Sequence, residues 1–239
     1  MYPLWASSCT STHCLSPNYS IEGDGITALS GSDLTITNNI ISNNSITGIY
    51  LDPTSSADVI NNTITGNGWY GINTGTSNLI SKNNIIAYNG VTGINSAASL
   101  NPDVTWNNLF GNAGLDFNAV APGSGNIFAD PLFIDIFNGN FNLRPDSPNI
   151  DAADSTNAPD TDFMGNDRFD APVDDTGIGS YTYYDIGALE FTGSILIPGD
   201  IDMDDDVDGK DLAAFADQLV TGTALITIEL FAAEFGTIK

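Results

Sequence analysis

Short stretches of alternating apolar and polar residues recur along the first half of the chain, with the same order of residue types each time. Each copy carries Asn-x-(Ile/Leu)-x-x-Asn and leads within a few residues into a Gly followed by an apolar residue. Strands this short cannot bury an apolar face alone, so they must stack on their equivalents in neighbouring turns. The pattern predicts a solenoid of about 4–5 rungs. The four motifs are Asn39–Asn44, Asn62–Asn67, Asn84–Asn89 and Asn107–Asn112, followed by Gly48-Ile49, Gly71-Ile72, Gly93-Ile94 and Gly114-Leu115.

The repeated positions have separate expected roles. The apolar residues form two inward columns, because inward-facing aliphatic side chains of successive rungs pack on one another. The first Asn of each motif suits the turn between strands, since Asn tolerates left-handed backbone and bonds local peptide groups. Stacked Asn side chains also bond one another as a ladder. The columns are Ile41, Ile64, Ile86 and Leu109, then Ile49, Ile72, Ile94 and Leu115, with Asn39, Asn62, Asn84 and Asn107 as the turn column.

This repeat resembles the right-handed parallel β-helices of the pectate-lyase-like superfamily over residues 25–133. The resemblance implies a mainly β fold, a single-stranded right-handed parallel β-helix. It implies much less about activity, because the superfamily contains lyases, hydrolases, epimerases, adhesins and inert spacers, and function depends on the site. Residues 1–24 are expected to be an N-terminal cap or the remnant of upstream rungs.

A second series of motifs follows the rungs. The series resembles the region called choice-of-anchor Q, which follows β-helices in bacterial surface and secreted proteins. The resemblance implies that residues 134–194 cap the last rung, whose open edge needs a cover. Arg144 and Arg168 are expected to be structural partners of Asp185, Asp151 or Glu190. The motifs are Asp130–Phe133, Phe141–Ala152, Gly165–Arg168 and Asp185–Phe191.

Regularly spaced aspartates occur in the last segment, residues 195–239. Carboxylates fall at positions 1, 3, 5, 9 and 12 of a loop that begins at Asp200, while position 7 offers a backbone carbonyl and position 8 is the apolar Val207. This is the ligand spacing of an EF-hand calcium loop. The sequence therefore predicts one Ca²⁺ site in a small α-helical module. The expected ligand residues are Asp200, Asp202, Asp204, Asp206, Asp208 and Asp211.

The loop and the helix expected after it resemble the first repeat of a type I dockerin. This resemblance implies a docking partner, either a cohesin-like or another cell-surface protein. The sequence departs from the family in two ways: Asp205 occupies the position where a Gly normally makes the sharp turn, and the segment Thr221–Ala224 lacks the second calcium loop.

Composition narrows the partners further. Five Lys and Arg residues oppose thirty Asp and Glu residues, giving a net charge of −25. Nucleic acids and anionic membranes need basic residues for attraction, so neither is expected as a partner. No apolar run approaches the ~20 residues of a membrane span. Ca²⁺, a hard cation that takes oxygen ligands, is the expected counterion.

Two cysteines, Cys9 and Cys14, lie close together near the N-terminus. A local disulfide is the first interpretation, and two free thiols or a metal site with His13 are the alternatives. The start of the chain has no basic n-region and too short an apolar part for a signal peptide. The chain is therefore expected to be the mature or truncated tail of a secreted protein.

Catalytic residues are scarce in the repeats. Lys82 is the single cation of the rungs, and His13, the only histidine, lies outside them. An outward column that follows the Gly positions is a candidate polysaccharide-binding strip, with ordinary solvated surface as the alternative. Its residues are Tyr50, Asn73, Asn95 and Asp116.

Two functions follow. The first is a noncatalytic extracellular or cell-surface β-helix protein, with a structural, adhesion or assembly role and a calcium-binding docking module. The second is the C-terminal part of a polysaccharide lyase or glycoside hydrolase that acts on a plant or algal polysaccharide.

Overall fold

The structure is a computed structural model, and it describes residues 10–11, 23–75, 78–96, 102–192, 212–213 and 216. The chain divides into two compact units, Met1–Phe191 and Thr192–Lys239. In the second unit the described residues 212, 213 and 216 are helical. The predicted calcium loop, Cys9 and Cys14 lie outside the described residues. No helix in the described part of the chain is long and apolar enough to cross a bilayer.

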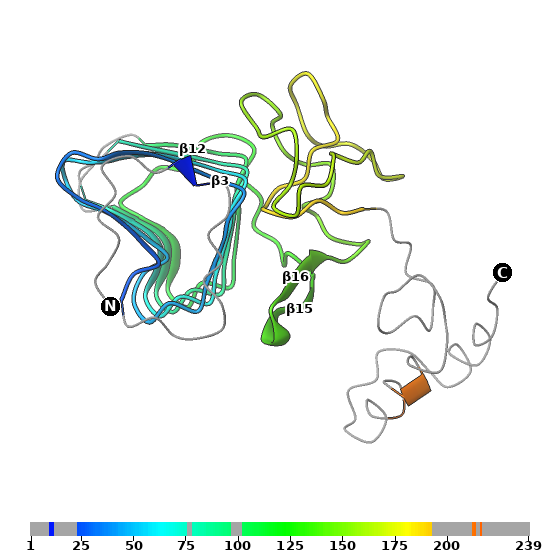
Figure 1. Cartoon of the computed structure of the whole chain (residues 1–239), viewed down its shortest axis with the longest axis horizontal. Coiled ribbons are helices and arrows are strands. Elements are labelled where there is room, and N and C mark those ends of the chain that lie inside the picture. The colour runs from blue at the N-terminus through cyan, green and yellow to red at the C-terminus, as the bar shows by residue number, and fades with distance from the viewer. Residues whose placement is uncertain are drawn as a thin grey trace. The chain divides into compact units, whose positions relative to one another are not determined.

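The first unit is built on a parallel β-solenoid, as the repeat predicts (Figure 1). Each rung contributes one strand to each of three sheets, and strands of neighbouring rungs pair in parallel. The first sheet has the order β1 (Thr10–Ser11), β3 (Asp33–Thr37), β6 (Ser56–Ile60), β9 (Leu79–Lys82), β12 (Asp103–Thr105). The second has the order β4 (Ile40–Ser42), β7 (Thr63–Thr65), β10 (Ile85–Ala87), β13 (Asn108–Phe110). The third has the order β2 (Ile26–Ala28), β5 (Ile49–Leu51), β8 (Tyr70–Thr74), β11 (Thr92–Ser96), β14 (Leu115–Asn118).

The predicted aliphatic columns form the core, except in the last rung. Leu115 is 56% exposed, whereas Phe117 packs against the core and pairs in register with Ile94. The pairing of Ile94 with Phe117 keeps the repeat at 23 residues, because strands can only stack if the rungs have nearly equal lengths. The Gly114-Leu115 pair comes two residues too early, so its assignment to the column was wrong. The confirmed buried members are Ile41, Ile64, Ile86, Leu109, Ile49, Ile72 and Ile94.

Asparagine ladders run along the solenoid, as the motif predicts. The turn column is linked from Asn39 to Asn62, Asn84 and Asn107 by side-chain amide bonds of 3.1, 3.0 and 2.9 Å, and Asn126 extends it. The second Asn of each motif forms another ladder, with amide bonds of 2.8, 3.0 and 2.9 Å. Left-handed backbone falls instead on the residue before the turn column, at Asn38, Asn61, Asn83 and Trp106.

The end of the solenoid is closed by the segment that directly follows β14. Val120 is buried against the core. The N–H of Leu109 donates to Ile127 O at 3.0 Å, and the N–H of Ile127 donates to Asn107 O at 2.8 Å. Residues 123–127 therefore bond to the edges of β12 and β13 in the last rung.

Residues 131–191, here called the lateral cap, lie beside the solenoid (Figure 1). They begin with a hairpin of β15 (Phe133–Asp135), η1 (Ile136–Asn138) and β16 (Asn140–Leu143), and continue mainly in irregular structure. The lateral cap packs on the outer face of the second sheet: Ile85 lies in one apolar cluster with Ile186, and Ile40 lies in another with Leu189. Both faces of this sheet are consequently buried.

Polar bonds fasten the lateral cap across several rungs. Asn61 Nδ2 donates to Asp185 O at 3.0 Å, and the N–H of Gly187 donates to Asn83 O at 2.9 Å. A Cβ at Gly187 would lie 2.7 Å from Ile85 Cδ1, and its φ is +113°, so only glycine fits this close approach.

Candidate functional site

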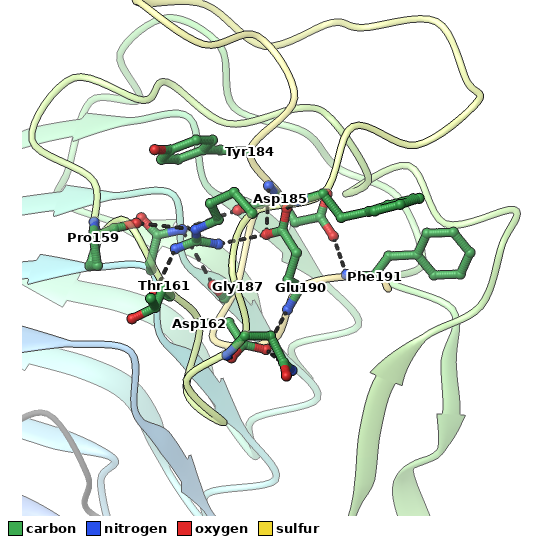
Figure 2. Close-up of polar contacts among 12 residues, drawn as sticks. Pro159, Thr161, Asp162, Tyr184, Asp185, Gly187, Glu190 and Phe191 are labelled. Carbon is green, nitrogen blue, oxygen red and sulfur yellow. Dashed lines mark hydrogen bonds and ion pairs between the residues drawn. The ribbon is translucent and has the colours of Figure 1, made fainter. Parts of the chain in front are cut away.

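The lateral cap contains a buried ion pair between Arg168 and Glu190. Figure 2 shows Glu190 among its polar neighbours. Arg168 Nη1 lies 2.6 Å from Glu190 Oε2, and the two side chains are only 2% and 0% exposed. The guanidinium also donates to Pro159 O at 3.1 Å and Thr161 O at 3.3 Å, and its carbon lies 4.9 Å from the centre of the Tyr184 ring. Multiple partners satisfy both charges, which a buried ion pair requires.

Two further carboxylates hold loop backbone around this pair. Asp185 accepts from the N–H of Asp151 at 2.8 Å and from the N–H of Phe191 at 2.6 Å. Asp162 accepts from the N–H of Met164 at 2.8 Å and from the N–H of Glu190 at 3.2 Å (Figure 2). These side chains substitute for regular secondary structure, because in irregular loops buried backbone donors must find partners elsewhere.

Burial shifts the ionisation of the two central acids. The pKa of Asp185 is raised well above its usual range by burial, and the neighbouring Glu190 carboxylate raises it further. Burial also raises the pKa of Glu190, although the Arg168 guanidinium opposes this shift. We assign the negative charge of the two acids to Glu190, because its carboxylate pairs with the Arg168 guanidinium. Buried groups with saturated partners cannot reach a substrate, so this network organises the fold.

Lys82 connects the solenoid to the lateral cap. Its Nζ lies 2.7 Å from Asp154 Oδ2 and donates to Thr156 O at 2.7 Å. The side chains of Lys82 and Asp154 are 12% and 13% exposed. Burial alone would raise the pKa of Asp154, but the bonds from Lys82 and Thr156 lower it overall. The single cation of the rungs is thus bound to a carboxylate.

The expected structural roles of the two cap arginines are confirmed in part. Arg168 pairs with Glu190, one of its three candidate partners. Arg144 pairs instead with Asp146, with 3.4 Å between Nε and Oδ1. It reaches the nearest acid along the chain because Pro145 places them in one turn, Arg144–Ser147. The prediction for Arg144 was wrong.

The outward polar column exists, but its last member differs from the prediction. Tyr50 pairs with Asn73, Asn73 with Asn95, and Asn95 with Asn118. Asn118 takes the position that the sequence assigned to Asp116, because the last rung begins two residues later than the Gly114 alignment implies. Amide bonds link Asn118 to Asn95 at 2.7 Å and Asn95 to Asn73 at 2.8 Å. The assignment of Asp116 to this column was wrong.

A separate group of carboxylates lies on the lateral cap. Asp151, Asp170 and Asp175 each offer an oxygen, and the three oxygens lie within 4.8 Å of one another. Asp151 is fully buried, whereas Asp170 and Asp175 are exposed. Burial raises the pKa of Asp151 to about 7; the N–H of Ala171 acts in the opposite direction, and the charges of Asp175 and Asp170 add to the rise.

The sequence did not identify this group, because its members are widely spaced and lie in irregular loops. The sequence offers Asp151 only as a candidate partner of an arginine, but Arg144 pairs with Asp146 and Arg168 pairs with Glu190. Fold-dependent contacts bring Asp170 and Asp175 to Asp151, and no local motif records them.

A comparison with protein families matches residues 6–130 to the family described as "Right handed beta helix region", which is more than half of the 239 residues. No curated protein and no solved structure matches the chain significantly.

Proposed function

Because this chain belongs to the right-handed beta helix family, we propose that it is a noncatalytic β-helix protein of the cell surface or the secreted fraction. Its role is structural, adhesive or in assembly, with the solenoid as a rigid spacer. We further propose that Asp200–Asp211 binds one Ca²⁺ and that the module around it docks to a cohesin-like or other cell-surface protein.

One observation carries the noncatalytic assignment. Each of the three Lys and Arg residues in the described part of the chain is engaged with a carboxylate: Lys82 with Asp154, Arg144 with Asp146, and Arg168 with Glu190. Removing a proton next to a uronate carboxylate needs a free base and a cation that neutralises the substrate. Lys82 Nζ is occupied by Asp154 Oδ2 and Thr156 O, so it is not free to act on a substrate.

The rung amides support the same proposal. Asn62, Asn84 and Asn107 are fully buried and bond their neighbours in the ladder. A side chain with its donors and acceptors engaged along the solenoid stabilises stacking and has no capacity left for a substrate. The regular positions of the repeat thus serve the length and stiffness of the solenoid.

Enzyme assays of the purified chain test this proposal. We expect neither new reducing ends nor unsaturated uronate absorbance above the level of heat-denatured protein, across pectins, alginates and neutral glycans. Turnover that is abolished in Lys82→Ala and retained in Arg144→Ala would overturn it, because only the first change removes a cation of the rungs.

The second candidate, part of a polysaccharide lyase or hydrolase, is favoured by one surface feature. Trp69 is 55% exposed and contacts Tyr70 edge-on, with 6.2 Å between ring centres, at the start of the strand that carries Asn73. An exposed aromatic ring can stack on a sugar, and amide groups of the same face can bond sugar hydroxyls. Retardation of the wild type in a glycan-containing gel, lost in Trp69→Ala, would support a sugar-binding strip even without turnover.

A further inference from the structure

We propose that Asp151, Asp170 and Asp175 form a divalent-cation site of the lateral cap and that the ion is Ca²⁺. This inference is independent of the function proposed above and of the loop Asp200–Asp211. It rests on the position of Asp151, on the convergence of the other two acids, and on the charge of the surroundings.

Asp151 is a buried acid without a hydrogen-bond partner for its side chain. The residue is fully buried, and neither Oδ1 nor Oδ2 has a donor in hydrogen-bonding geometry, although the nearby Ala171 N–H lowers the pKa of this carboxyl group. A buried carboxylate left in this state costs several kcal/mol unless a cation or donors compensate it. The other buried acids of the lateral cap, Asp162, Asp185 and Glu190, all accept hydrogen bonds, so Asp151 requires a separate explanation.

The backbone holds Asp151 in place. Its N–H donates to Asp185 at 2.8 Å, and its carbonyl accepts from the N–H of Thr176 at 2.9 Å and of Gly177 at 2.8 Å. Its φ is +50°, a left-handed conformation that costs free energy for a residue other than glycine. These backbone bonds fix the position of Asp151 and thereby the direction of its side chain.

One loop brings the other two ligands to Asp151. Asp170 and Asp175 flank the buried Ala171, which packs in the same apolar cluster as Ala152 and Ala153. Thr176 and Gly177 fasten the far end of this loop to the Asp151 carbonyl. Thr182 Oγ1 donates to Asp175 Oδ2, which leaves Oδ1 as the free oxygen of that carboxylate.

The donor set selects the ion. Three carboxylates with no His or Cys ligand suit a hard cation and disfavour Zn²⁺ or Cu²⁺. Ca²⁺ takes 6–8 oxygens in flexible geometry, and two exposed ligands leave room for water, whereas Mg²⁺ demands a near-ideal octahedron. Ligands on irregular loops form an irregular coordination shell more readily than an octahedral one, which favours Ca²⁺ over Mg²⁺. The ion would also offset most of the negative charge of three acids that no Lys or Arg among the described residues contacts in an ion pair.

Calcium titration of the chelator-treated full chain by calorimetry tests the site. We expect the double variant Asp170→Asn, Asp175→Asn to bind one Ca²⁺ fewer than the wild type. The charge-matched control Asp167→Asn, Asp174→Asn changes two exposed acids of the same cap outside the group, and it should bind as many ions as the wild type. Equal stoichiometry in all three proteins would overturn the proposal, as would a wild type that binds no Ca²⁺.

Further variants separate this site from the predicted loop. Asp200→Asn with Asp202→Asn should remove a different ion and leave the cap site intact, so failure of either site is visible without the other. Asp151→Asn keeps the side-chain shape and should also lose one ion; if it does not fold, the exposed double variant still decides the question. Displacement of the bound ion by an equal concentration of Mg²⁺ would contradict the assignment to Ca²⁺.

Discussion

Replacing Asn84 by Ala should strongly destabilise the solenoid. Asn84 is fully buried in the middle of the turn column. Its Oδ1 accepts from the backbone N–H of Asn62 at 2.8 Å, and its Nδ2 donates to Val59 O at 2.7 Å and to Asn107 Oδ1 at 2.9 Å. Alanine removes all of these bonds and offers nothing in their place.

The magnitude follows from the groups left without partners. The N–H of Asn62 is left without an acceptor, and a buried donor left unsatisfied costs about 1–3 kcal/mol. The lost bonds from Asn84 Nδ2 to Val59 O and to Asn107 Oδ1 add about 0.5–1.5 kcal/mol each. The sum, about 2–6 kcal/mol before any cavity term, is a large part of the ~5–15 kcal/mol stability of a typical domain. The matched control is Asn118→Ala, which removes an exposed amide of the outer column and should cost under about 1 kcal/mol.

Urea unfolding followed by far-UV circular dichroism measures both variants, with the slope of the transition as a check on two-state behaviour. Two results would refute the reasoning. One is a loss for Asn84→Ala no larger than that for Asn118→Ala. The other is a large loss in both, which would mean that burial does not decide the strength of a ladder.

Three further predictions concern the lateral cap. A double-mutant cycle of Lys82→Met and Asp154→Asn should give a coupling energy of about 0.5–3 kcal/mol, and additive effects would show that the pair does not fasten the cap. Gly187→Ala should lower the melting temperature, because an added Cβ meets Ile85, and an unchanged value would contradict the close packing. The pKa of Asp185 is raised in the folded state, so between the ordinary pKa of 3.8 and the raised pKa the folded state binds more protons than the unfolded state. The unfolding free energy should therefore fall as the pH rises between these two pKa values. Asp185→Asn should reduce the change of the unfolding free energy with pH, and an unchanged pH profile would mean that other groups cause this change.

The repeat predicted the solenoid because each of its signals is local. Ile64 and Asn62 sit at fixed distances from their equivalents in the next rung, so the spacing alone indicates which residues stack. The error in the last rung has a physical cause as well: a Gly114-Leu115 pair imitates the motif two residues early, and only strand pairing shows that Phe117 fills the core position.

For the lateral cap, the sequence could indicate which kinds of residue pair with one another, but not where the cap lies. The sequence marked Glu190 as one of three candidate partners of Arg144 and Arg168, since the few cations in an acidic stretch need carboxylates. It could not show that the cap lies against the side of the solenoid, because the apolar cluster that contains Ile85 and Ile186 joins segments about a hundred residues apart without a repeated spacing. The same holds for the convergence of Asp170 on Asp151.

The noncatalytic assignment is tested most directly by lyase and hydrolase assays of the full chain, with and without added Ca²⁺, on a broad polysaccharide panel. The account predicts no turnover above the denatured control in either condition, because the described cations are bound to carboxylates. Turnover that disappears in Lys82→Ala while the variant retains the wild-type circular dichroism spectrum would contradict it.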